Sequence, residues 1–344
     1  MMAATARKTH PASRRQSFPD RFSVLLIAFA AILWVSDAYF RNPLTEHLSA
    51  SQIVVMEDAL VTLILLPFLI RGFAELRSLT GSRWLGVLII GVGPQAIATW
   101  LFTKSFAHHV FAVTYIAQQT QPLIAIALAW IILGERRRPW FWPLAAVGMV
   151  GVYLVVFARD PGEPLAVLQG GQLAGTADTR LVAGLEGLGA AVLWAAGTVF
   201  GRFVLRDLSF QTTTALRFTV ALPVLVAIVL IEGGLSGFSH YQLSYFLPNF
   251  LYIAIVPGVI GLLIYYRGLV STPASLATIA ELTLPVTIQL LAALPYPWGF
   301  GQPFYFPAQV VGTALLLGVI LSLNWTKERR PPVLVASTEA LGAA

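Results

Sequence analysis

Ten apolar stretches of roughly 20 residues follow one another along the chain, and they limit what it can fold into. Of its 344 residues, 57% are hydrophobic and only 11% are charged, whereas a soluble domain carries about 25% charged residues. An apolar stretch of about 20 residues is long enough to cross a bilayer as an α-helix. The predicted spans are 22–42, 50–70, 83–103, 110–133, 140–157, 181–202, 210–231, 244–266, 273–294 and 304–325. We therefore predict an all-α integral membrane protein with ten transmembrane helices.

The distribution of basic residues indicates how these spans are oriented. The net charge is +6, but the Lys and Arg residues do not gather in a patch that would bind nucleic acid. All but five of the 22 lie in the N-terminal tail, in every second loop or in the C-terminal tail. The exceptions are Arg41, Lys104, Arg159, Arg180 and Arg217. Cytoplasmic loops carry the excess of Lys and Arg. We therefore predict a protein of the plasma (inner) membrane with both termini on the cytoplasmic side.

Enzyme motifs are almost absent from the sequence. The chain has no cysteine, and therefore no disulfide, thiolate ligand or cysteine nucleophile. It has neither the GxxxxGK of a P-loop nor HExxH, and the adjacent His108 and His109 point to different helical faces. A GxSG sequence at 234–237, with His240, is similar to that of intramembrane proteases, but it falls in a short loop. We therefore expect no enzyme, no metal and no cofactor.

The two halves of the chain repeat the same motifs in the same order. AAILW, ending at Trp34, recurs as AAVLW 160 residues later, and Pro94 recurs as Pro257 at an offset of 163. YIAQQTQPL at 115–123 likewise aligns with TIAELTLPV at 278–286. Such self-similarity indicates two copies of one structural unit, here a unit of five predicted spans.

An odd number of spans in each unit has a consequence for topology. The second copy must enter the membrane from the opposite side, and inverted repeats of this kind build secondary transporters with a binding site near the bilayer midplane. The expected organisation is a cytoplasmic tail (1–21), a first five-helix repeat (22–157), an external linker (158–180), a second five-helix repeat (181–325) and a second cytoplasmic tail (326–344).

One segment also resembles a known family. QPLIAIALAWIILGERRRPWFWPLAAVGMVGVYLVV, from Gln121 to Val156, together with the two repeats and the Trp late in the first span, resembles the EamA-type permeases of the drug/metabolite transporter superfamily. The second repeat departs from the pattern, since it has PYPWGFGQP where Gly-Glu would stand. The resemblance implies ten helices, a central cavity and transport of small metabolites by alternating access.

Prolines mark the expected walls of this cavity. A proline inside a helix leaves the carbonyl four residues earlier without its donor. Pro122 is therefore predicted to free the carbonyl of Gln118, and Pro285 that of Glu281. The repeat-matched Pro94 and Pro257 predict helix breaks in the third and eighth spans.

Glu281 is the foremost candidate for a substrate-binding residue. An acid in the middle of a membrane costs about 2.5–3.5 kcal/mol on insertion scales, so it has a function or a fixed partner. It could line the cavity, where it would exchange a proton or hold an amine, or it could form a structural hydrogen bond. Gln118, Gln121 and Tyr115 share one helical face by their spacing. They could bind a polar ligand or hydrogen-bond between helices.

Four further residues are weaker candidates for the cavity: Trp34, Asp37, Trp194 and Tyr265. The two tryptophans are repeat-matched and could stack on a ring or a cation. Glu57 and Arg217 occupy equivalent places with opposite charge, so they could pair, but we favour separate partners on other helices. Glu135 is expected to form a local ion pair with the arginines that follow it, and Gly197 and Gly201 to allow close helix packing.

Taken together, these features predict a secondary transporter of small metabolites, either amino-acid-like or related polar solutes, with export as the favoured direction and protons as a candidate coupling ion. Two alternatives stay open: a membrane-embedded enzyme acting on lipid or peptide, and a membrane protein that does not transport but binds a partner. The expected partners are a small-molecule substrate and the lipid bilayer, and the sequence carries no signal for an oligomeric state.

Overall fold

The computed structural model describes residues 22–106, 108, 117–118, 120–137, 139–157, 177–233, 243–293 and 307–325, and every regular element within them is a helix. The first half contains α1 (Ser23–Thr45), α2 (Ala50–Arg71), α3 (Phe73–Leu76), α4 (Gly81–Ile90), the π-helix η2 (Gly91–Ile97), α5 (Ala98–Phe106), α7 (Gln121–Leu133) and α8 (Phe141–Phe157). The second half contains α10 (Ala177–Val204), α11 (Phe210–Ile231), α12 (Leu243–Ile253), the π-helix η4 (Ala254–Gly261), α13 (Leu262–Ser271), α14 (Ala274–Ala280), α15 (Thr283–Ala293) and α16 (Pro307–Trp325).

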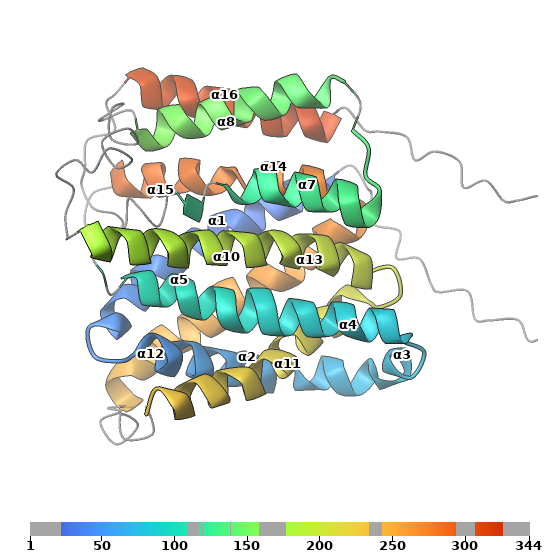
Figure 1. Cartoon of the computed structure of the whole chain (residues 1–344), viewed down its shortest axis with the longest axis vertical. Helices are drawn as coiled ribbons and strands as arrows, with labels where there is room; N and C mark the ends of the chain where they lie inside the picture. The colour runs from blue at the N-terminus through green and yellow to red at the C-terminus, as the bar shows by residue number, and fades with distance from the viewer. Residues whose placement is uncertain are drawn as a thin grey trace, which may run out of the picture.

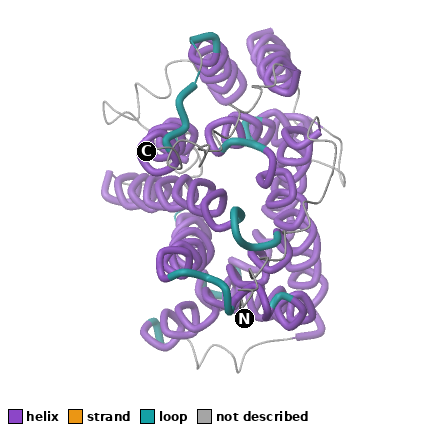
Figure 2. The backbone as a smooth tube through the Cα atoms, turned by 90° about the vertical axis from the view of Figure 1, so that its right-hand side faces the viewer, coloured by secondary structure: helices purple, strands orange, loops and turns teal. Residues whose placement is uncertain are grey.

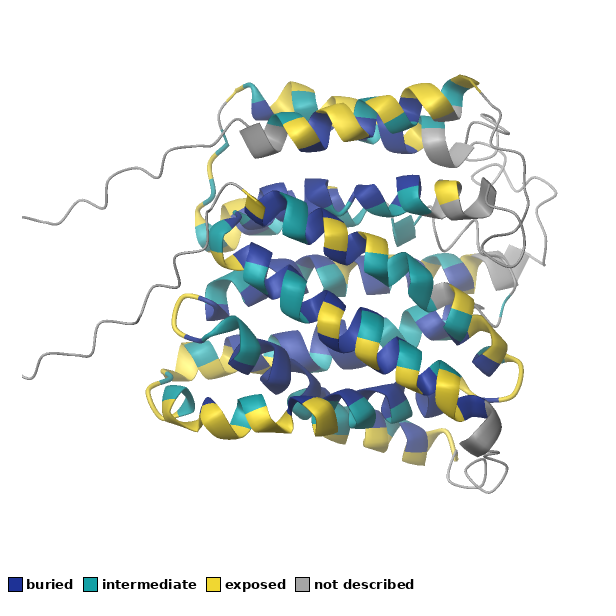
Figure 3. Ribbon diagram, turned by 180° about the vertical axis from the view of Figure 1, so that it is seen from behind, coloured by how far each residue is buried: buried dark blue, intermediate teal, exposed yellow. Residues whose placement is uncertain are grey.

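Six helical stretches are long and apolar enough to cross a membrane: Ser23–Thr45, Ala50–Arg71, Gly81–Ser105, Leu181–Val204, Phe210–Ile231 and Phe246–Ser271. The other predicted spans correspond to four shorter apolar helices: Gln121–Leu133, Phe141–Leu154, Ala274–Thr287 and Val310–Ser322. Large apolar side chains are exposed on the outside of these helices, for example at Leu63, Ile131 and Ile231, and Figure 3 shows exposed positions along the helices themselves. The chain is therefore a multi-pass membrane protein.

The helices lie in successive tiers and run roughly along one direction (Figure 1). In the view turned by 90°, most of them are seen nearly end-on (Figure 2). α8 and α16 pack along their length at one edge of the molecule, and α2 and α11 pack in the same way near the opposite edge. Each pair joins one helix from the first half of the chain to one from the second half.

α2 and α11 begin by the same local device. Ser49 precedes α2 and its side chain accepts a hydrogen bond from the amide of Gln52, while Ser209 precedes α11 and accepts one from the amide of Thr212. A serine at this place satisfies a backbone N–H that has no partner inside the helix. Ser209 follows Ser49 by 160 residues, the same offset as the repeated tryptophan.

Pro94 and Pro257 lie within π-helical turns rather than at helix breaks, which differs from the expectation above. A proline lacks the N–H of the helical ladder, and the wider π turn absorbs that loss without ending the helix. Each proline carbonyl accepts an indole N–H from the other half of the chain. Trp194 Nε1 donates to Pro94 O at 3.1 Å, and Trp34 Nε1 donates to Pro257 O at 3.2 Å.

The predicted close packing at Gly197 and Gly201 is confirmed. A Cβ atom added to Gly197 would lie 2.7 Å from Pro94 Cβ, and one added to Gly201 would lie 2.7 Å from Tyr266 Cε1. The absence of side chains on this face of α10 therefore lets η2 and α13 approach it closely.

Replacing Gly201 with alanine is expected to destabilise the protein by about 1–3 kcal/mol, because the added Cβ would overlap the fully buried ring of Tyr266. A Cβ added to Gly318 on α16 meets nothing within 4 Å, so Gly318→Ala is the matched control. The control is expected to be neutral or to stabilise by up to about 1 kcal/mol through helix propensity. Thermal unfolding of the purified variants measures both effects, and equal melting temperatures for the two would contradict the close packing.

Candidate functional site

Glu281 lies where the helix containing it is interrupted. α14 ends at Ala280 and α15 begins at Thr283, so the acid is at a short turn between two helical segments. The backbone carbonyl of Glu281 accepts a hydrogen bond from Leu284 N at 2.9 Å. The prediction that Pro285 leaves this carbonyl unpaired is therefore wrong. In the turn, the amide three residues later donates to the carbonyl in place of the N–H that the proline lacks. The group of Glu281 that could contact a ligand is therefore its side chain and not its backbone carbonyl.

The Glu281 carboxylate accepts hydrogen bonds from two side chains that lie on other helices. Gln121 Nε2 donates to its Oε2 at 2.8 Å, and the Tyr265 hydroxyl donates to its Oε1 at 2.8 Å. Since that hydroxyl gives its hydrogen to Glu281, Thr198 Oγ1, at 2.8 Å, is the donor to Tyr265. These residues come from α7, α13 and α10, so one acid ties three helices to the turn after α14. Both oxygens of Glu281 are held in place before any ligand arrives.

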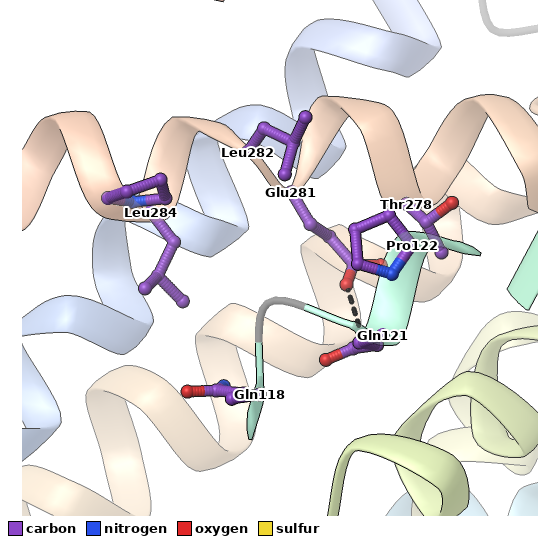
Figure 4. A pocket seen from close by; sticks show the side chains of 8 residues that line it. Gln118, Gln121, Pro122, Thr278, Glu281, Leu282 and Leu284 are labelled. Carbon is purple, nitrogen blue, oxygen red and sulfur yellow. Dashed lines mark hydrogen bonds between the residues drawn. The ribbon is translucent and has the colours of Figure 1, made fainter. Parts of the chain in front are cut away.

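A pocket opens beside this acid (Figure 4). It is lined by Gln118, Gln121, Pro122, Thr278, Glu281, Leu282, Leu284 and Pro285. Both of the repeat-matched stretches, 115–123 and 278–286, therefore contribute to one pocket, as their matching had suggested. Pro122 lies in the first turn of α7, where a proline is well tolerated. Gln118 Oε1 is buried and has no hydrogen-bond partner among the described residues, so one residue of the pocket lining carries an unpaired acceptor.

The two matched tryptophans occupy comparable surroundings but only one adjoins Glu281. The Trp34 ring lies 5.1 Å from the Tyr265 ring, and Tyr265 is the residue that binds the acid. The Trp194 ring lies 5.0 Å from the Phe102 ring, which has no hydroxyl to offer. Both indole N–H groups are engaged by the proline carbonyls described above. Tyr115, the remaining candidate, lies outside the described residues.

Asp37 belongs to a different cluster from Glu281. Both of its carboxylate oxygens accept from Arg41, at 2.6 and 2.8 Å, and Arg41 Nη2 also donates to Glu57 at 2.7 Å. Glu57 therefore pairs with α1 rather than with Arg217, as we had favoured. The structure does not bring Asp37 to the pocket, because its spacing of one helical turn from Arg41 lets the two side chains pair locally.

Glu135 has more partners than the local ion pair that the sequence indicated. That pair is present, with Arg137 Nη2 at 3.2 Å. The carboxylate also accepts from the amides of Ala274 and Ser275, at 2.9 and 3.1 Å, and from the Ser275 hydroxyl at 2.7 Å. The first amides of a helix lack partners inside it, so Glu135 caps α14 from the loop after α7. Sequence reasoning missed this contact, as it missed Thr198, because neither residue has a distinctive local pattern.

In the part of the chain that the structure describes, no group of three or more His, Asp or Glu side chains could hold a metal ion. The combination of apolar helices, an interrupted helix and a pocket with one acid and two amides is typical of a membrane transporter. The sequence model of the EamA-like transporter family matches residues 21–157 and again residues 183–325. The chain belongs to this family, which is part of the drug/metabolite transporter superfamily.

Individual relatives agree with this assignment. The chain is 27% identical over 309 residues to the riboflavin transporter ImpX of Fusobacterium nucleatum, covering 87% of this chain and 96% of that protein. It is 24% identical over 266 residues to the uncharacterized transporter YwfM of Bacillus subtilis, covering 74% and 81% of the two chains. A protein crystal structure with 20% identity superposes with a TM-score of 0.65 over 87% of this chain and 95% of that one, which shows a shared fold.

Proposed function

We propose that this protein is a secondary transporter that carries small polar metabolites across the plasma (inner) membrane by alternating access, with export as its direction. Membership of a transporter family supports the general activity. The pocket at Glu281 supports the location of the substrate, since an acid and two amides there face a space that both halves of the chain line.

The proposed architecture is ten membrane-crossing helices in two inverted repeats, with both termini in the cytoplasm. The crossed contacts support it. Trp34 contacts Pro257 and Tyr265, and Trp194 contacts Pro94 and Phe102. Subtracting the repeat offset of 163 from Pro257 and Tyr265 gives Pro94 and Phe102, and the tryptophans differ by 160. Contacts that exchange in this way are expected when a two-fold axis relates the halves.

The substrates we propose are solutes that carry N–H donors, above all amino acids and amines. The carboxylate of Glu281 and the free oxygen of Gln118 are both acceptors, and a charge-assisted hydrogen bond is about twice as strong as a neutral one. Flavins are a second candidate, because ImpX is a riboflavin transporter and a flavin ring has both an N–H and a face that could stack on Trp34. Protons are the proposed coupling ion.

Transport by purified protein in proteoliposomes tests the proposal. The vesicles contain a pH-sensitive dye and are challenged with riboflavin and with separate pools of amino acids, amines and organic acids. We expect a proton flux and uptake of labelled solute with one pool or with riboflavin, and neither in protein-free vesicles. No movement of any solute would contradict the proposal. Turnover of added lipid or peptide without solute movement would favour the enzyme, and the absence of both would favour a partner protein.

A further inference from the structure

A second buried polar network contains none of the residues that line the pocket. Arg217 Nε on α11 donates to Gln95 Oε1 at 2.7 Å, and Gln95 Nε2 on η2 donates to Asp58 Oδ1 on α2 at 3.0 Å. Arg217 Nη1 also donates to the Tyr266 hydroxyl at 3.2 Å. One amide therefore separates a buried acid from a buried base, and its orientation is fixed because each end has a different partner.

Asp58 has an oxygen that this network leaves unsatisfied. Its exposed fraction is 0%, and Oδ2 has no hydrogen-bond partner. Among the described residues, it is the one buried carboxylate oxygen without a donor, whereas Glu281 and Asp37 have donors on both oxygens. A buried acceptor on a charged group is costly when it is unpaired. A proton on Oδ2 removes that cost.

A second unpaired polar group lies on the same helix. Thr62 lies one turn beyond Asp58 on α2, and its hydroxyl is likewise buried without a partner. Residues four apart on a helix are side-chain neighbours. No hydrogen bond joins the two side chains, so each keeps a hydrogen-bonding capacity that the described residues do not satisfy.

The other charged groups near Asp58 interact with other residues. Its sequence neighbour Glu57 is paired with Arg41. On α5, which also packs against α2, Lys104 is paired with Glu186. Arg217 reaches Asp58 through Gln95 rather than directly. None of these groups donates to Oδ2, so the position is available to a proton.

The two networks meet on neighbouring residues of α13. Tyr265 donates to Glu281, and the next residue, Tyr266, accepts from Arg217. Their rings are 5.7 Å apart. A movement of α13 that releases Tyr265 from the acid therefore also changes the distance from Tyr266 to Arg217, and with it the charge that faces Asp58 through Gln95.

We propose that Asp58 is the proton-binding site of the transport cycle, separate from the solute site at Glu281, and that the Gln95–Arg217–Tyr266 chain couples the two. This inference rests on the proposed transport function. It assigns one task to each acid: Glu281 binds the solute, and Asp58 takes up and releases the proton whose movement drives solute transport.

Infrared spectroscopy of the purified full-length protein tests proton binding without any solute. A protonated carboxylic acid has a C=O stretching band that a carboxylate lacks, so a titration over pH reports each buried acid. We expect a titrating band that disappears in Asp58→Asn and persists in Glu57→Gln, the adjacent acid that serves as the matched control. A band unchanged in Asp58→Asn would overturn the assignment.

Proteoliposomes test the coupling with whichever of riboflavin and the solute pools the wild type carries. Asp58→Asn is expected to keep solute counterflow, which needs no net proton movement, and to lose proton uptake. Proton uptake that persists in this variant would overturn the proposal. If Asp58→Asn does not fold, Asp58→Glu retains an acid moved by one methylene, and both its band and its pH profile are expected to shift; two unchanged readouts would overturn the inference. If the wild type carries no solute, the transport function fails and the infrared band alone decides whether Asp58 binds a proton.

Discussion

Replacing Glu281 with glutamine is expected to reduce solute transport by about 10- to 100-fold, the loss that corresponds to one charge-assisted hydrogen bond of about 1.5–3 kcal/mol. The carboxylate accepts from Gln121 and from Tyr265. A glutamine of the same shape keeps one acceptor oxygen but turns an N–H₂ group toward one of these donors. The variant therefore loses both the negative charge and the arrangement of the pocket. Uptake of labelled solute by proteoliposomes measures the change.

Two controls separate a lost binding site from lost structure. Glu232→Gln changes an exposed acid at the end of α11 and is expected to transport as the wild type does. Tyr265→Phe removes one donor to the acid and leaves the charge, so its loss should be smaller than that of Glu281→Gln. Transport by Glu281→Gln at the wild-type rate, in a protein recovered in normal yield, would place Glu281 among structural residues.

Replacing Arg217 with methionine is expected to destabilise the protein by about 1–3 kcal/mol for each of the two buried acceptors, Gln95 Oε1 and the Tyr266 hydroxyl, that lose their donor. Arg217 is 8% exposed and Asp58 is 0% exposed. Methionine has a similar length but gives no donor to Gln95, so the acid loses the positive charge that compensates it through the amide. Thermal unfolding in detergent is expected to show the largest loss among the variants named here.

The double variant Arg217→Met with Asp58→Asn distinguishes charge from packing. Removing both charges leaves neither Asp58 nor Arg217 as an uncompensated ion, and neutral replacement of a buried pair is often tolerated. The double variant should therefore be more stable than Arg217→Met alone. If the two losses simply add, the arginine and the acid do not interact across Gln95.

The sequence allowed the helices to be predicted well where local signals mark their ends. The predicted span 210–231 coincides with α11, whose start is fixed by the Ser209 cap. The predicted span 244–266 stopped before Arg267, whereas the helix continues to Ser271 and ends just before Pro273. A basic residue at a membrane surface need not end a helix, but the residue before a proline disfavours the helical conformation.

The pocket could be predicted from the sequence because its two walls are copies of one repeated motif. The hydrogen-bond and ion-pair partners of individual side chains could not be predicted. Matching of the stretches containing Gln118 and Glu281 predicted that they would face one cavity, and they line one pocket. The link from Gln95 to Arg217 depends on how far each helix is rotated about its axis, which composition does not specify. For the same reason, Asp37 looked like a cavity residue until its pairing with Arg41 was seen.

The crossed tryptophan contacts mean that neither half of the chain is self-sufficient. A half expressed alone would have an indole donor without its acceptor and a widened proline turn without its donor. Two copies of one half could satisfy both needs by pairing with each other, as in a dimer that predates a gene duplication. Such a dimer would carry either two copies of the Tyr265–Glu281 pair or none. Fusing two unlike halves into one polypeptide is what allows the described lining of the pocket to contain a single carboxylate, that of Glu281.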